Sequence, residues 1–188
     1  RPMYEANARL EVFDCVVFSS ATGVRYFLNR LLATGGDLRR FGKVRLAAIG
    51  PGTAAQLAQY HLRADLTPEE FRAEALAEAL LQAQAGQPAG CRVLLVRASR
   101  GRAVLAEMLQ AAGVEVHQIV AYTSADVAEP VPEITQALAE GRIDWVTVTS
   151  SSIARSLVQM FGQNLRKAKL ASISPITSQV LRELGYPP

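Results

Sequence analysis

The sequence is poor in the residues from which most metal and redox sites are built. Its 188 residues include only two cysteines and two histidines: Cys15, Cys91, His61 and His117. The cysteines form no C-x-x-C pair, and neither histidine has another ligand at metal-binding spacing. We therefore expect no metal site. We also expect two buried, reduced thiols, because each cysteine begins an apolar, strand-like run.

The sequence also lacks a long hydrophobic run. No apolar segment reaches the ~18 residues that a transmembrane helix needs. The first residues, RPMYEANARL, have no apolar signal core. These features predict a cytoplasmic protein with no membrane partner. Because basic runs and interleaved aromatic and basic residues are missing as well, we expect no nucleic-acid partner.

Charge is modest in total and uneven along the chain. The formal net charge is +3. Residues 1–64 contain nine Lys/Arg against four Asp/Glu, whereas residues 65–80 contain five acidic residues and one arginine. Such unevenness is common on a solvated surface, and it also suits an anionic ligand.

The usual catalytic motifs are missing too. No Ser–His–Asp set has plausible spacing, and Ser19 lies in no G-x-S-x-G motif. Asp14 and Asp144 precede their strands, so we expect both at the sheet edge away from the ligand-facing turns. An enzyme made from this sequence must work with hydroxyl groups, backbone amides and Tyr122. That requirement implies a reactive substrate that needs shaping more than activation.

Five short apolar runs are present, and they are nearly continuous rather than alternating. Such runs are typical of strands buried on both faces of a parallel sheet. Amphipathic helical patterns lie between them, which predicts a parallel α/β fold. The expected strands are residues 15–19, 45–49, 92–97, 145–149 and 169–173.

One strand–turn–helix segment occurs twice. KVRLAAIGPGTAAQL begins at Lys43 and KAKLASISPITSQVL begins at Lys167, with seven of fifteen positions identical. FDCVVFSSATGVRYFL from Phe13 likewise resembles IDWVTVTSSSIARSLV from Ile143. Two related units in the same order predict two similar α/β lobes. The expected connection between them is AYTSADVAEPVPE, which two prolines stiffen.

Each repeated strand ends in a turn that opens a helix. A helix N-terminus presents unpaired N–H groups and the positive end of the helix dipole, which favour carboxylate or phosphate. Open parallel sheets bind ligands at this edge. The same residues also serve simply as helix caps, and for any single turn both interpretations stay open. The candidates are Ser19, Ser20, Gly50, Thr53, Thr149, Ser150, Ser151 and Thr177.

Two further candidates end strands of the first lobe. Arg97 closes LLVR and precedes Arg100 and Arg102. This arginine group either holds an anion or is solvated turn charge, and it is no P-loop because GKS or GKT is missing. Tyr122 closes VHQIVAY, where the chain leaves the first lobe. A tyrosine there usually packs as an amphipathic ring, and this one also stands at the expected cleft.

Taken in order, the motifs resemble the uroporphyrinogen-III synthase family (HemD-like). The resemblance implies two parallel α/β lobes of flavodoxin-like topology joined by a two-strand connector. Residues 1–121 would form the first lobe, and residues 122–188 an incomplete second lobe without its N-terminal portion. Ser174 stands where the family usually has glycine. The motifs that carry the resemblance are DCVVFSSATGV, LAAIGPGTAAQL, VLLVRASRGRAVLAEMLQAAGVEVHQIVAY, DWVTVTSSSIA and LASISPITSQVLRELG.

The resemblance also implies a reaction. The family closes the linear tetrapyrrole hydroxymethylbilane to uroporphyrinogen III, losing water and inverting ring D, without metal or organic cofactor. By resemblance, Tyr122 assists departure of the hydroxyl, and Thr53 and Thr177 match threonines that line the cleft. The family's hydroxyl turns are matched by Ser19, Ser20, Thr149, Ser150 and Ser151. All of these except Tyr122 are expected to bind the substrate, together with Gly50 and Arg97. A monomer is expected. The alternative is a non-catalytic, two-lobed binding or sensory protein of the same fold, which a DNA-binding extension would favour.

Overall fold

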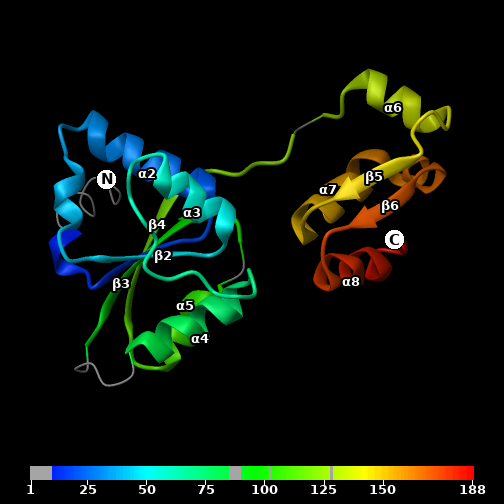
Figure 1. Ribbon diagram of the computed structural model, residues 1–188. Helices are drawn as coiled ribbons and strands as arrows, with labels where there is room; N and C mark the ends of the chain where they lie inside the picture. Colours follow the sequence, from blue (N-terminus) through cyan, green and yellow to red (C-terminus); the bar gives the residue numbers. More distant parts are fainter. Residues whose placement is uncertain (1–9, 85–89, 102, 128) are drawn as a thin grey trace. The chain divides into compact units, whose positions relative to one another are not determined.

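The computed structural model describes residues 10–84, 90–101, 103–127 and 129–188. The chain divides into two compact units, Arg1–Ser124 and Ala125–Pro188 (Figure 1). Each unit contains helices and a parallel sheet, which confirms the predicted α/β class.

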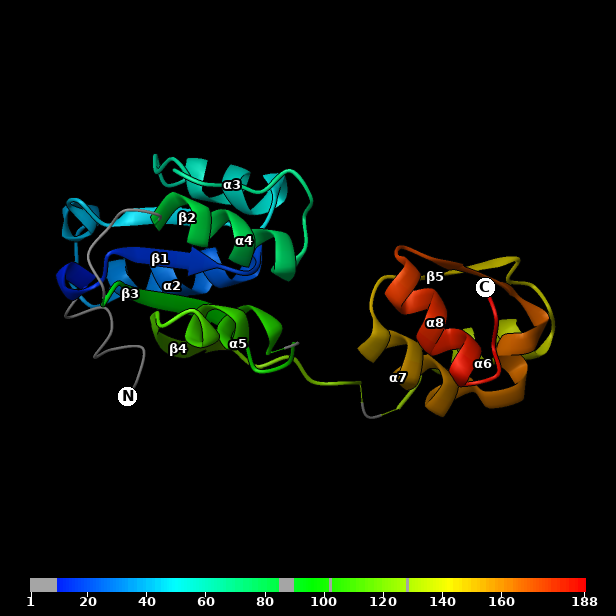
Figure 2. The ribbon, with the colours of Figure 1, turned by 90° about the horizontal axis from the view of Figure 1, so that it is seen from below.

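The first unit is built on a four-stranded parallel sheet with the order β2-β1-β3-β4 (Figure 2). The strands are β1 (Cys15–Phe18), β2 (Arg45–Ala48), β3 (Arg92–Ala98) and β4 (Glu115–Tyr122). Strands β1, β2 and β3 confirm the predicted ranges 15–19, 45–49 and 92–97, and each ends within one residue of its predicted end. Ser19 lies just past β1, because the chain there is already turning into a helix, although its N–H still donates to the Val96 carbonyl.

Helices cover both faces of this sheet. The first face carries α2 (Ala21–Ala33) and α3 (Pro51–Ala58), and the second carries α4 (Ala73–Gln84) and α5 (Val104–Ala111). Side chains alternate along each strand, so Val16 and Phe18 enter the core under α2 and α3, while Val17 enters the other. The described part of the first unit also contains the 3₁₀ turns η1 (Leu10–Val12) and η2 (Leu38–Phe41).

The cysteines fit their expected roles in part. Neither forms a disulfide, in line with the expected reduced thiols. Cys15 is buried, and burial raises the pKa of its thiol to about 12. Cys91 is only half-buried, because it lies just before β3 begins and the sheet does not yet enclose it.

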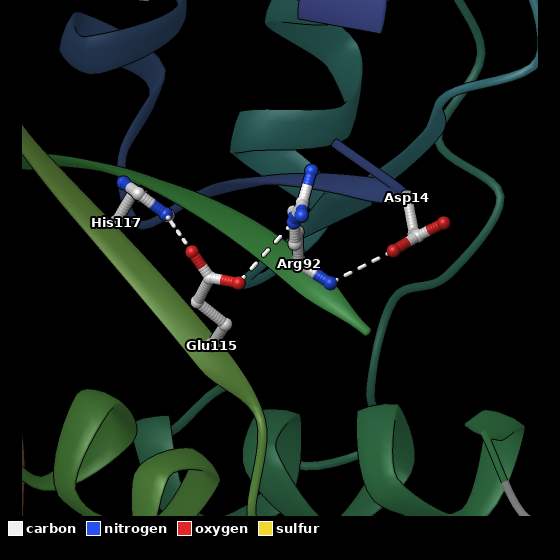
Figure 3. Close-up of polar contacts among 4 residues, drawn as sticks. All are labelled: Asp14, Arg92, Glu115 and His117. Carbon is white, nitrogen blue, oxygen red and sulfur yellow. Dashed lines mark hydrogen bonds and ion pairs between the residues drawn. The ribbon is translucent and has the colours of Figure 1, made fainter. Parts of the chain in front are cut away.

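A polar cluster joins three strands at the amino edge of the sheet (Figure 3). The Asp14 carboxylate accepts a hydrogen bond from the Arg92 N–H at 2.7 Å, and Glu115 pairs with the Arg92 guanidinium at 3.2 Å. His117 Nε2 lies 2.7 Å from the other Glu115 oxygen. The hydrogen bond with His117, helped by Arg92, lowers the pKa of Glu115. The contacts of the exposed Glu115 carboxylate with His117 and Arg92 therefore stabilise the fold above this pKa, and that stabilisation is lost as the pH falls through it.

Asp14 is the end of this cluster that lies before β1, and Asp14→Ala should lower the free energy of unfolding by about 1 kcal/mol. Its backbone bonds to Arg45 and Arg92 remain in the variant, so only the side-chain acceptor is lost. Urea denaturation measures the change. Asp14→Asn keeps a side-chain acceptor and should lose less of the free energy of unfolding than Asp14→Ala does. Equal losses in the two variants would show that the acceptor contributes nothing.

The second unit contains a two-stranded parallel sheet. Its core is formed by Val148, Ala154, Leu165, Leu170, Val180, Leu181 and Tyr186. The elements are α6 (Pro132–Ala139), β5 (Trp145–Val148), α7 (Ser151–Phe161), η3 (Gly162–Lys167), β6 (Lys169–Ser172) and α8 (Pro175–Glu183). Both strands predicted in this unit are confirmed, and each ends one residue earlier than predicted.

Helix α6 corrects the expected connection. The connection was expected to include Pro132, but Pro132 is the first residue of α6. Proline is well suited to that position, because the first residue of a helix needs no N–H for the helix's own hydrogen bonds. Its fixed φ is also already helical. Of the described residues between β4 and α6, 123–127 and 129–131 are irregular.

Candidate active site

Parallel strands bring their carboxyl ends to one edge of the first sheet, and most candidates of the first unit lie there. Phe18 pairs with Ala48 on one side and with Val96 on the other, while Ala98 pairs with Tyr122. The turns after β1 and β2 and the end of β4 therefore share this edge. As expected, Asp14 lies at the opposite edge.

Ser20 and Tyr122 form a hydrogen bond at this edge. Their hydroxyl oxygens are 3.1 Å apart, and either one can donate. Ser20 is also the N-cap of α2, where its oxygen accepts the Gly23 N–H at 3.0 Å. Ser19 lies beside them, half-buried, and its hydroxyl donates to the Val96 carbonyl. Both serines are thus used in local structure, and Ser20 also touches the candidate catalytic phenol.

Tyr26, on α2, packs against the same phenol and was not predicted from the sequence. Its ring stacks on the Tyr122 ring with centroids 5.7 Å apart and an interplanar angle of 17°. The Arg25 guanidinium lies 5.4 Å from the Tyr26 centroid. No spacing rule links positions 26 and 122, so only the folded sheet could identify this pair.

A register shift determines where the Tyr122 side chain points. Residues of β3 and β4 pair one to one as far as Arg97 and Val120, but Ala98 then pairs with Tyr122. One extra β4 residue is accommodated at this bulge. The bulge places Tyr122 on the face that α2 covers, where it packs against that core.

Arg97 lies on the other face. Alternate residues of a strand point to the same face, and Arg97 follows Val93 and Leu95 in this series. Both of those residues belong to the core beneath α4 and α5. Its guanidinium donates to the Gln118 side chain at 2.9 Å and to the Ala98 carbonyl at 3.1 Å. The first unit therefore does not bring Arg97 together with Tyr122. Arg102, the other end of the arginine group, lies outside the described residues.

The turn between β2 and α3 differs from the other helix starts. Its N-cap is Gly50, so no side chain caps α3. Gly50 has an extended backbone, but a Cβ there would lie 3.2 Å from two Phe71 atoms, so close packing favours glycine. Thr53 in the first turn is only 5% exposed, and its hydroxyl has no hydrogen-bond partner within the described chain.

The second unit repeats this arrangement after β5. Ser150 is the N-cap of α7, and its oxygen accepts the Ile153 N–H at 3.2 Å. Thr149 is exposed, while Ser150 and Ser151 are half-buried. These hydroxyls lie at the carboxyl edge of the small sheet, since Val148 pairs with Ser172.

After β6, Ser174 takes the role that glycine has in the first unit. It caps α8 by accepting the Thr177 N–H at 3.3 Å, and its oxygen lies 3.1 Å from the Thr177 hydroxyl. Its backbone is extended, so no glycine is required. Thr177 is only 2% exposed, and unlike Thr53 its hydroxyl has a partner.

The described residues show neither a metal site nor a membrane span. They contain no group of three or more His, Cys, Asp or Glu side chains that could hold a metal ion. None of the helices in this part of the chain is both long and apolar enough to cross a bilayer.

Comparison with known proteins gives a consistent result. The family model for uroporphyrinogen-III synthase HemD matches residues 1–188. A putative uroporphyrinogen-III synthase from Methanothermobacter thermautotrophicus is 32% identical over 96% of this chain and 73% of that protein. The uroporphyrinogen-III synthase from Synechococcus elongatus is 31% identical over 97% of this chain and 71% of its own length.

Solved structures agree at the level of the fold. A mutant uroporphyrinogen III synthase from Thermus thermophilus matches the whole chain and 77% of its own length, with a TM-score of 0.67 and 20% identity. The Helicobacter pylori enzyme matches 93% of this chain and 75% of its own, with a TM-score of 0.64 and 21% identity.

Proposed function

The chain belongs to the uroporphyrinogen-III synthase HemD family, and we propose that it closes hydroxymethylbilane to uroporphyrinogen III. The reaction is that of a hydro-lyase, because the linear tetrapyrrole loses its hydroxyl as water. Ring D is inverted through a spiro intermediate before the macrocycle closes. The proposed mechanism uses no metal or organic cofactor.

The observation that best supports this proposal is the Tyr122 phenol at the carboxyl edge of the sheet. Tyr122 would donate a proton to the departing hydroxyl, which leaves as water. The pyrrole nitrogen supplies the electron pair that expels it. The negative charge left on the phenol oxygen would lie close to the N-terminus of α2, whose dipole stabilises it.

The substrate carries several carboxylates, and the turns are proposed to bind them. Four helices begin beside the candidate hydroxyls, and each presents N–H groups with a positive dipole end. The turn that begins α3 suits an anion best, because no side chain caps it and the Thr53 hydroxyl has no hydrogen-bond partner among the described residues. Arg97 could take part only by leaving Gln118.

We propose that the two units belong to two lobes of one flavodoxin-like architecture. The first lobe would be residues 1–121, and residues 122–188 would supply part of the second. Two observations support an incomplete second lobe. Its sheet has two strands rather than four, and Trp145 and Ile173 are 59% and 72% exposed. The stretch between β4 and α6 would then be one of the two chain segments that connect the lobes. We also propose a monomer that works in the cytoplasm.

The proposal is tested by the isomer that the full-length protein produces. Hydroxymethylbilane is supplied, and the porphyrinogens are oxidised and separated. Spontaneous closure gives the type I isomer, so an excess of the type III isomer is expected. A product mixture equal to that of the buffer control would disprove the proposed activity.

Thr53→Val separates a binding role from a structural one. Valine has nearly the same shape, and it removes a buried hydroxyl to which the described part of the chain offers no hydrogen-bond partner. The free energy of unfolding should therefore rise by about 1 kcal/mol, while turnover of the bilane falls. Thermal unfolding and the isomer assay measure the two effects.

Thr177→Val is the matched control. There the hydroxyl pairs with Ser174, so the same change should lower the free energy of unfolding by about 1 kcal/mol. If Thr53→Val leaves turnover unchanged, the Thr53 hydroxyl has no role in binding.

A further inference from the structure

We propose that Ser20 is a positioning residue whose hydroxyl donates its proton to Tyr122, and that the Tyr122 proton is thereby directed toward the substrate. The inference rests on the proposed catalytic role of Tyr122 and goes beyond it. It changes the role expected for Ser20 from substrate binding to control of the phenol.

The direction of the hydrogen bond follows from the surroundings of Ser20. A serine hydroxyl has one proton and two lone pairs. One lone pair is taken by the Gly23 N–H at 3.0 Å. The first turn of α2 presents N–H donors and positive potential, so the serine proton is favoured on the side away from the helix. The Tyr122 oxygen lies there at 3.1 Å, and it is the other partner that the described residues provide.

This direction has a chemical consequence. A phenol that receives a hydrogen bond keeps its own proton for another acceptor. As that proton moves to the leaving hydroxyl, negative charge grows on the Tyr122 oxygen, and the bond from Ser20 strengthens. Ser20 thus stabilises the transition state more than the bound substrate. Such an interaction affects kcat rather than KM.

Two further contacts hold this arrangement in place. Tyr26 stacks on the Tyr122 ring and limits its rotation. Gly23 leaves room for the serine oxygen, because a Cβ at that position would lie 3.1 Å from it. Helix α2 therefore fixes the ring of Tyr122 through one residue and its oxygen through another.

The test uses full-length protein and four variants at Ser20 and Tyr122. Ser20→Gly removes the hydroxyl but keeps a residue that is tolerated at an N-cap, so helix α2 should stay folded. We expect kcat to fall about 3- to 10-fold, the value of one neutral hydrogen bond, with little change in KM. Ser20→Thr keeps both the acceptor and the donor and should retain most of the activity.

The double variant Ser20→Gly/Tyr122→Phe distinguishes the proposal from direct substrate binding. Without the phenol oxygen, Ser20 has nothing to donate to, so the double variant should match Tyr122→Phe alone. If Ser20→Gly lowers kcat equally in both backgrounds, or if it has no effect, the inference is overturned while the proposed function stands. If Tyr122→Phe has full activity, the catalytic role of Tyr122 fails, and the inference fails with it.

Gly23→Ala tests the same arrangement without changing either hydroxyl. Alanine favours the helical conformation over glycine, so thermal stability should hold or rise. The added methyl group displaces the Ser20 oxygen, and kcat should fall about 2- to 5-fold, a fraction of one hydrogen bond. Unchanged kcat in this variant, or an equal fall in the Tyr122→Phe background, would contradict the inference.

Discussion

The Tyr122→Phe variant is expected to lower kcat about 10- to 100-fold, at or below the lower end of the range for general acids. The effect is limited because the pyrrole nitrogen already drives the hydroxyl out. A phenol is also a weak acid, and its advantage here is position rather than strength. Phenylalanine keeps the ring that stacks on Tyr26 and removes only the hydroxyl. Turnover to the type III isomer measures the result.

Stability provides the control for this variant. The Tyr122 hydroxyl bonds to the half-buried Ser20, so its loss should lower the free energy of unfolding by about 1 kcal/mol. The variant must therefore be assayed well below its unfolding temperature. Formation of the type III isomer at the normal rate would show that Tyr122 only packs, and that the shape of the site does the work.

The largest loss of stability is expected from Phe18→Ala, at about 3–5 kcal/mol. Phe18 is fully buried, and its ring meets the Phe27 ring of α2 edge to face at 5.7 Å. Truncation would leave a cavity between the sheet and this helix. Phe18 also immediately precedes the Ser19–Ser20 turn, so the position of the Ser20 hydroxyl depends on the same packing. Denaturant unfolding of the full-length protein gives the change.

Phe18→Leu separates volume from aromatic contact. Leucine fills most of the space of the ring. Phe18→Leu should therefore lower the free energy of unfolding by only about 1–2 kcal/mol, less than Phe18→Ala. If alanine and leucine destabilise the protein equally, the edge-to-face contact rather than the cavity is responsible. If neither destabilises it, the core around Phe18 is not closely packed.

The sheet could be predicted from the sequence because its strands are buried on both faces. The runs at Val16 and Leu94 are continuous and apolar, and parallel pairing follows from the helices between them. Helix α6 was missed for an equally physical reason. Pro130 and Pro132 usually mark a connection, and the sequence does not show that Pro132 is the residue at which a helix begins.

The candidate site was predictable where it depends on strand ends and not where it depends on side-chain direction. The hydroxyl turns follow from the rule that parallel strands bring their carboxyl ends to one edge. The sequence does not reveal that Arg97 turns toward Gln118 or that Tyr26 stacks on Tyr122. Both depend on how β3 and β4 pair, and that pairing includes an irregularity that no local pattern announces.

The bulge opposite Arg97 makes this part of the chain intolerant of insertions. Removing one residue between Ile119 and Tyr122 would restore regular pairing with β3 and leave the phenol opposite Ala98, on the face of Ser20. One inserted residue would instead move the phenol past Ala98 and turn it to the opposite face, away from Ser20. Relatives with extra residues should therefore carry them after Tyr122 and not between Ile119 and Tyr122.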